Sequence, residues 1–228
     1  MPLNPPAASN LSSVFEHQTY LLRKRFFKHF FRHFGVTYYI YDPSDRLVFF
    51  IEGNENPFAW YKAIRLYAEE AMRTELVLIQ PRQVLGFFVA YDVIDSATQV
   101  KVGALRRTGR KSILILDAND VPIGSVKEAR MNLPLVRRFL NELLLRPQKW
   151  HGEVRGQPVC AFKLNFNPGV FKLALDVLEL DFSMDQGKLL DRRLGVAAGV
   201  LLIAAPAVAA LSRGGHAAKV TPQLLPKD

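Results

Sequence analysis

Basic residues are the side chains in this sequence best suited to binding chemistry, and they form two clusters. The first cluster, within RKRFFKHFFRHF, comprises Arg23, Lys24, Arg25, Lys28 and Arg32. The second, within RRTGRK, comprises Arg106, Arg107, Arg110 and Lys111. Each Lys or Arg close to an anionic lipid surface contributes about 1 kcal/mol to binding. Nine such charges bind a membrane only if they lie on one side of the molecule, and the alternative is that both clusters are ordinary charged residues of the outer surface.

Phenylalanines interleave the first basic cluster with a helical spacing. They are Phe26, Phe27, Phe30, Phe31 and Phe34. This spacing predicts an amphipathic helix over residues 23–34, with the phenylalanines on one side and the basic residues on the other. Such a helix is typical of a segment that lies on a membrane surface. The alternative is a helix that packs its phenylalanines on the rest of the domain.

The residues that usually carry catalysis or bind metals do not form a recognisable pattern. The sequence has no nucleophile elbow, zinc-protease motif or phosphate-binding glycine loop. His29 and His33 are four residues apart, but two histidines without further ligands are poor evidence for a metal site. The acidic residues near 92–95 and 117–120 fit turn chemistry better than acid–base catalysis. We therefore predict a protein that is not an enzyme and has no cofactor and no metal site.

Composition limits the compartment and the class of partner. The 228 residues carry a formal net charge of +9, which favours anionic partners, either a membrane surface or nucleic acid. A single cysteine, Cys160, excludes an intrachain disulfide and indicates a reducing compartment. Residues 1–18 are rich in proline and do not resemble a signal peptide, so we expect a flexible leader and a cytoplasmic protein. The domain is expected to span residues 19–211, followed by a polar tail over residues 212–228.

Most of the domain has the pattern of consecutive antiparallel strands. Runs rich in β-branched and aromatic residues alternate with breaks that contain turn formers, of which Pro43-Ser44 is an example. The expected strands are 20–22, 35–42, 46–52, 61–68, 74–80, 87–95, 100–107, 112–116, 122–127, 149–154, 159–166 and 171–182. The segment Leu133 to Leu145 has a helical period instead and predicts one lateral helix.

An apolar segment near the C-terminus has no polar side. Leu194 to Leu211 carries no charge, and a helix of this kind must be buried in a protein core or in a membrane. Its length of about 27 Å is just short of a bilayer core, so both interpretations stay open. Small residues and Pro206 favour burial in protein. A closed sheet of about twelve strands leaves a hollow that a slim helix can fill. We therefore predict a mainly β, α+β fold: a closed twelve-stranded antiparallel β-barrel around a central hydrophobic helix over residues 189–211.

Two segments resemble motifs of tubby C-terminal-like proteins. They are YDVIDSATQVKVGALRRTGRKS, residues 91–112, and GQPVCAFKLNFNPGVFKLALDV followed by LDRRLGVAAGVLL, within residues 156–202. The resemblance is to bacterial proteins related to LURP-one-related proteins and phospholipid scramblases, and it covers most of residues 20–211. It implies a twelve-stranded barrel around a C-terminal helix and a non-enzymatic role near a membrane. Scramblase-like proteins place an acidic loop before the final helix. In this chain Gln186 and Arg192 stand where a calcium loop needs Gly and Glu, so no calcium site is predicted.

The leading functional hypothesis is binding of anionic phospholipid at the inner face of the membrane. It rests on the resemblance, the net charge and the basic, phenylalanine-rich segment. A second hypothesis is phospholipid scrambling, with residues 194–211 as a transmembrane helix. A third is a nucleic-acid-binding or protein-interaction module, although no motif supports nucleic-acid binding. The sequence leaves the oligomeric state open.

Overall fold

Twelve strands form one closed antiparallel barrel in the computed structural model, which describes residues 13–25, 37–51, 63–84, 88–109, 112–129, 148–165 and 177–204. The strands are β1 (Thr19–Arg25), β2 (Thr37–Tyr41), β3 (Leu47–Ile51), β4 (Ile64–Tyr67), β5 (Glu75–Val84), β6 (Phe88–Asp95), β7 (Val100–Gly109), β8 (Ser112–Leu116), β9 (Pro122–Glu128), β10 (Gln148–Val154), β11 (Gln157–Asn165) and β12 (Val177–Asp181). Within the described residues two helices accompany them, the 3-10 helix η2 (Ser13–Phe15) and the α-helix α2 (Arg192–Ala204). The predicted barrel is confirmed.

The ring closes where the first strand meets the last. Every other neighbour in the ring is also a neighbour in sequence, so the sheet is a meander whose ends join through β1 and β12. Leu22 of β1 lies opposite Leu178 of β12 on one side and opposite Ile40 of β2 on the other. All three side chains are buried. Because each described strand has a partner on both sides, the ring presents no unpaired edge.

Side chains along each strand alternate between the inner and the outer face of the barrel wall. In β1, Tyr20 and Leu22 are fully buried in the interior cluster, whereas Leu21 packs with a second, smaller cluster. That second cluster consists of four aromatic residues, Tyr39, Tyr41, Phe50 and Tyr67. The wall formed by β1 to β4 therefore has apolar residues on both of its faces.

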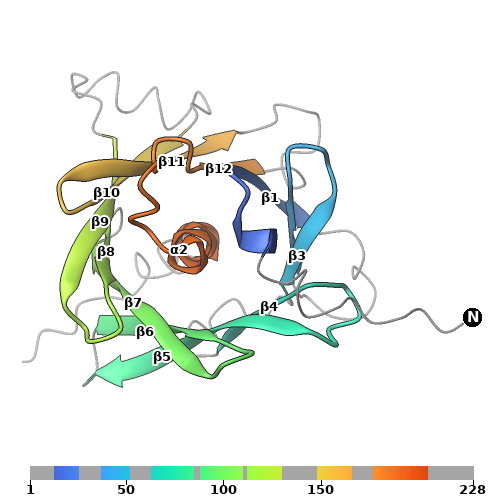
Figure 1. The fold of residues 1–228 in the computed structure, drawn as a ribbon, viewed down its shortest axis with the longest axis horizontal. Coiled ribbons are helices and arrows are strands. Elements are labelled where there is room, and N and C mark those ends of the chain that lie inside the picture. The colour runs from blue at the N-terminus through green and yellow to red at the C-terminus, as the bar shows by residue number, and fades with distance from the viewer. Residues whose placement is uncertain are drawn as a thin grey trace, which may run out of the picture.

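Helix α2 runs through the interior of the ring, and Figure 1 shows it end-on inside the circle of strands. Its 13 residues span about 20 Å. Leu194, Val196 and Leu201 are among its buried residues, so the predicted burial of this segment in protein is confirmed for residues 194–202. The helix begins at Arg192 rather than at residue 189 because Asp191 caps it: the Asp191 carboxylate accepts a hydrogen bond from the Arg193 N–H at 2.9 Å. Residues 205–211 lie outside the described residues.

The basic segment after Leu22 departs from the expected helix. Arg23, Lys24 and Arg25 continue strand β1 and lie opposite Tyr39, Tyr38 and Thr37 of β2. The expectation that a helix begins at Arg23 is therefore wrong, because pairing of residues 23–25 with β2, and of Arg23 also with β12, overrides the helical spacing of the phenylalanines. The rest of that predicted helix, residues 26–34, lies outside the described residues. So do the predicted lateral helix at 133–145, residues 1–12 of the leader and the tail.

Alternating strand directions give the barrel two different ends. We call one the turn end: it holds the connections 42–46, 68–74, 96–99, 117–121 and 155–156, and the segment 182–191 that leads from β12 into α2. The opposite end, the loop end, holds the last residues of β1, β3, β5, β7, β9 and β11. The connections that leave the loop end, residues 26–36, 52–62, 85–87, 110–111, 130–147 and 166–176, lie outside the described residues.

Candidate anion-binding surface

Arg23 lies on the outer side of β1, where its charge already has partners. Its guanidinium forms an ion pair with Asp45 at 2.6 Å. It also lies over the ring of Tyr41, 4.7 Å from the centroid. A cation held by a carboxylate and an aromatic face is less available to a membrane than a solvated one. Lys24 and Arg25 are described only as backbone of β1, and Lys28 and Arg32 lie outside the described residues.

Arg106 and Arg107 are neighbours on β7 and face opposite sides of the wall. Arg106 is exposed on the outside. Arg107 lies opposite Ile113, which is buried in the interior cluster, so Arg107 faces into the barrel. Burial lowers the pKa of Arg107, and the charge of Tyr91 partly opposes this effect. The second basic cluster is therefore split between the two faces, and its other members, Arg110 and Lys111, lie outside the described residues.

The two basic clusters do not meet on the wall of the barrel. Strands β1 and β7 are separated by five strands in either direction around the ring. Figure 1 shows them on opposite sides of α2. They share only the loop end, which both strands approach with their last residues. A surface that uses both clusters must therefore be the end of the barrel and not its side.

Formal charge is distributed unequally between the connections of the two ends. The turn-end connections carry eight acidic and four basic residues. The connections that join the strands at the loop end carry ten basic and four acidic residues, together with ten of the 16 phenylalanines. By sequence, the connections between strands that end at the loop end are thus richer in basic and aromatic residues than those at the turn end.

Acidic residues near the turn end are engaged in the structure of that end. Asp42 accepts hydrogen bonds from the backbone N–H groups of Ser44 and Arg46, both at 2.9 Å, around the predicted turn at Pro43. Burial alone would raise the pKa of Asp42, but these hydrogen bonds and the Arg46 charge hold it below its ordinary value. Asp117 accepts the N–H groups of Asn119 and Val121 in the same way, at 2.9 Å. The interpretation of Asp117 as a turn residue is confirmed.

Sequence reasoning missed an ion-pair network on the outside of β5 to β7. Arg82 donates to Asp120 at 2.8 and 2.9 Å, and Lys101 donates to the same carboxylate at 2.8 Å. Asp92 lies 3.2 Å from Arg82 and 3.3 Å from Lys101. Hydrogen bonds from Arg82 and Lys101 lower the pKa of Asp120 far below its ordinary value. No local signal in the sequence indicates this network, because Arg82 and Asp120 meet only through the pairing of four strands.

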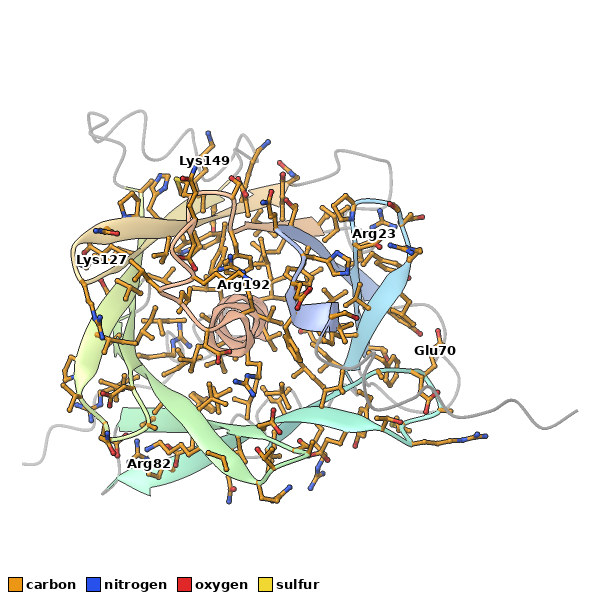
Figure 2. All side chains as sticks on the ribbon, viewed as in Figure 1. Arg23, Glu70, Arg82, Lys127, Lys149 and Arg192 are labelled. Carbon is orange, nitrogen blue, oxygen red and sulfur yellow. The ribbon has the colours of Figure 1, made fainter. Side chains whose placement is uncertain are left out.

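The segment before α2 contains a second network that the sequence did not indicate. The Asp185 side chain is fully buried and accepts hydrogen bonds from the N–H groups of Leu189 and Leu190 at 2.7 and 3.2 Å. Arg192 forms an ion pair with Asp185 at 2.7 Å and lies over Phe182, 4.8 Å from the ring centroid. Figure 2 shows Arg192 inside the ring beside α2, unlike Arg23, Arg82, Lys127 and Lys149 at its outer wall. The segment considered as a calcium loop instead fixes the entry of α2 into the barrel.

Arg193 attaches the start of α2 to the opposite wall. Its guanidinium pairs with Asp95, at the end of β6, at 2.5 Å, and with Asp191 at 2.6 Å. Burial would raise the pKa of Asp95, but hydrogen bonds from Thr98 and Arg193 hold it below its ordinary value. Together with the Asp185–Arg192 pair, this contact places the helix start between β6 and β12.

Neither a metal site nor a membrane-spanning helix is found in the described part of the chain. Within it, no three His, Cys, Asp or Glu side chains gather as metal ligands would. None of its helices combines the length and apolarity needed to cross a bilayer. No protein-family model matches the chain, and comparisons with curated proteins and with solved structures also return no match.

Proposed function

We propose that this protein is a non-enzymatic β-barrel that binds anionic phospholipid at the cytoplasmic surface of a membrane, related to the scramblase and LURP-one-related branch of the tubby C-terminal-like proteins. The observation that carries the proposal is the segregation of charge between the two ends of the barrel. The resemblance of residues 91–112 and 156–202 supports the family assignment.

The segregation of charge gives the molecule a preferred orientation toward an anionic surface. With an excess of six positive charges in the loop-end connections, and about 1 kcal/mol for each basic residue near the lipid, attraction at this end supports reversible binding. The turn-end connections have an excess of four negative charges by composition. Because Asp45, Asp120, Asp185 and Asp191 are paired with cations of the strands and of α2, this end has no comparable attraction to the surface. Since charge interactions are screened beyond about 8 Å at physiological salt, only the end that touches the membrane contributes strongly. The barrel would therefore bind end-on.

Vesicle co-sedimentation with two matched charge-reversal variants tests this orientation. R110E/K111E changes the loop end, and R155E/K188E makes the same change of charge at the turn end, where both residues are exposed. We expect the wild type to prefer vesicles with phosphatidylserine over neutral phosphatidylcholine vesicles. R110E/K111E should weaken this binding at least tenfold, whereas R155E/K188E should change it less than about twofold.

Two results would reject the proposal. One is equal binding of the wild type to anionic and neutral vesicles at moderate salt. The other is equal loss of binding in both charge-reversal variants, because that would show a response to net charge without orientation. Tight, steeply salt-dependent binding to oligonucleotides with no binding to vesicles would favour the nucleic-acid alternative instead.

A further inference from the structure

A short segment before β1 occupies the interior of the barrel beside α2. This segment, residues 13–18, is called the N-terminal arm below. Val14 and Phe15 of η2 pack against the interior cluster, and the Phe15 ring centroid lies 5.0 Å from that of Phe49 on β3. Figure 1 shows η2 inside the ring, between α2 and β3. The hollow of the barrel therefore holds two elements.

Helix α2 leaves room for the arm because it lies close to the other walls. A Cβ atom on Gly195 would come within 2.4 Å of the Phe182 ring, and one on Gly199 within 2.5 Å of Leu180. On β7, a Cβ atom on Gly103 would lie 2.9 Å from Leu194 of the helix. These glycines let α2 approach β12 and β7 closely, so the space toward β1 and β3 is left for Val14 and Phe15.

Half of the residues of the arm face solvent. Hydrogen bonds that join it to the barrel include that from the Tyr20 hydroxyl to the Val14 carbonyl at 2.9 Å and that from the Phe182 N–H to the Gln18 carbonyl at 2.7 Å. Ser13, Glu16 and Gln18 are exposed, and Val14 and Phe15 are only partly buried. Because the arm precedes β1, it lies at the turn end, away from the loop end.

Tyr20 places a hydroxyl group in the apolar space under the arm. Its side chain is fully buried among Phe49, Phe182 and other apolar residues, and the Val14 carbonyl accepts its hydroxyl hydrogen bond. A buried hydroxyl without an acceptor is unfavourable, so whatever replaces the arm must offer an oxygen acceptor. Burial raises the pKa of Tyr20, while the positive charge of Arg192 opposes this rise, which places a cation near the same hydroxyl.

We propose that the N-terminal arm covers, and is displaced from, a binding site for a long acyl chain whose head carries a carboxylate or ester oxygen. The chain would take the place of Val14 and Phe15 beside α2, and the oxygen would accept the Tyr20 hydrogen bond in place of the Val14 carbonyl. The site is distinct from the anionic surface at the loop end. Either proposal can fail without the other.

Titration with the fluorescent 18-carbon parinaric acid tests the site in the full chain. The wild type is compared with V14S/F15S, which weakens the packing of the arm, and with V14S/F15S/Y20F, which also removes the hydroxyl. We expect V14S/F15S to bind parinaric acid at least tenfold more tightly than the wild type. V14S/F15S/Y20F should bind it about fivefold more weakly than V14S/F15S. The peptide NLSSVFEHQ, residues 10–18, should displace the probe.

A hydrocarbon probe without oxygen, diphenylhexatriene, is the control for Tyr20. Its binding to V14S/F15S should not change when Y20F is added. Displacement of parinaric acid by oleate alone would identify a free fatty acid as the ligand, and displacement by dihexanoylphosphatidylcholine below its micelle concentration would identify a phospholipid chain. If V14S/F15S loses its cooperative thermal unfolding, F15A replaces it. Equal binding by the wild type and the arm variant, no displacement by the peptide, or no effect of Y20F on parinaric acid would overturn the proposal. Vesicle binding of V14S/F15S should equal that of the wild type.

Discussion

The turn end and the loop end of this barrel are built from different kinds of sequence. The turn-end connections are short, and the acidic side chains Asp42, Asp95 and Asp185 are used there to cap turns or to pair with arginines. The loop-end connections are mostly longer and contain most of the basic and phenylalanine residues that the described strands do not use. One end therefore fixes the fold, and the other carries the residues of the proposed binding surface.

A meander that closes on itself produces this separation directly. Successive strands alternate in direction, so every second connection returns to the same end of the ring. The connections of one set carry ten basic and four acidic residues in total, and those of the other set carry eight acidic and four basic residues, so the two ends differ in composition. We expect substitutions at the turn end to change stability and substitutions at the loop end to change binding, and the following predictions test that division.

The largest effect on stability is expected for D185A at the turn end. The substitution leaves the Arg192 guanidinium without its carboxylate and removes the acceptor of two backbone N–H groups. Breaking a buried ion pair on one side costs about 3–5 kcal/mol, and because 14% of the Arg192 side chain is exposed, we expect about 3 kcal/mol. Urea unfolding of the purified variant measures it. D45A, whose carboxylate is 67% exposed, is the control and should cost less than about 1 kcal/mol. Equal costs for the two would contradict the role of Asp185.

A somewhat smaller effect is expected when the wall is pushed away from α2. In G103A, the new methyl group would lie 2.5 Å from the Leu116 carbonyl oxygen and 2.9 Å from Leu194. Overpacking of this kind costs about 1–3 kcal/mol, and backbone on one side limits relaxation, so we expect about 2 kcal/mol by urea unfolding. G187A, in the connection to α2, has no atom closer than 3.5 Å to the new group and should stay within about 0.5 kcal/mol. A neutral G103A would mean that the helix is not tightly packed on β7.

The architecture was predictable because it depends on patterns that many residues share. Alternation and turn formers in a dozen short segments set the strand count, and the apolar stretch from Leu194 supplied the element that fills the ring. Local spacing was misleading at Arg23 to Arg25, where pairing with β2, and at Arg23 also with β12, outweighs a helical pattern of phenylalanines. A helical spacing of five phenylalanines does not prevent the residues before them from continuing a paired strand.

The candidate site was predictable in composition but not in arrangement. The two basic clusters are evident from the sequence, whereas the opposite positions of β1 and β7 follow only from the order of strands around the ring. The split of Arg106 and Arg107 between the two faces follows from strand alternation once the face of Ile113 is known. Contacts such as Arg82 with Asp120 depend on registers between strands that no local pattern encodes.

Acid should destabilise the fold through aspartates of the turn end. The pKa values of Asp42, Asp95 and Asp120 are lowered in the folded protein. A carboxyl group of this kind stabilises the fold fully above its unfolded pKa near 4, and this stability is lost as the pH falls through the folded pKa. Unfolding free energy should therefore decline below about pH 4. D42N should show a shallower decline than the wild type, because one of the linked protons is removed. An unchanged slope in D42N would exclude Asp42 from the acid response.

The smallest effect is expected for R23Q, although Arg23 belongs to the first basic cluster. Its charge is neutralised by Asp45 and its guanidinium rests on Tyr41, so it contributes little free charge to the loop end. The ion pair is partly exposed, with 67% of the Asp45 side chain accessible, and pairs of this kind contribute about 0–1 kcal/mol to stability. We expect less than a twofold change in vesicle binding and a loss of stability below about 1 kcal/mol. If R23Q instead weakened vesicle binding as strongly as R110E/K111E is expected to, the binding surface would extend down the β1 wall. Binding and stability would then not be separated between the two ends.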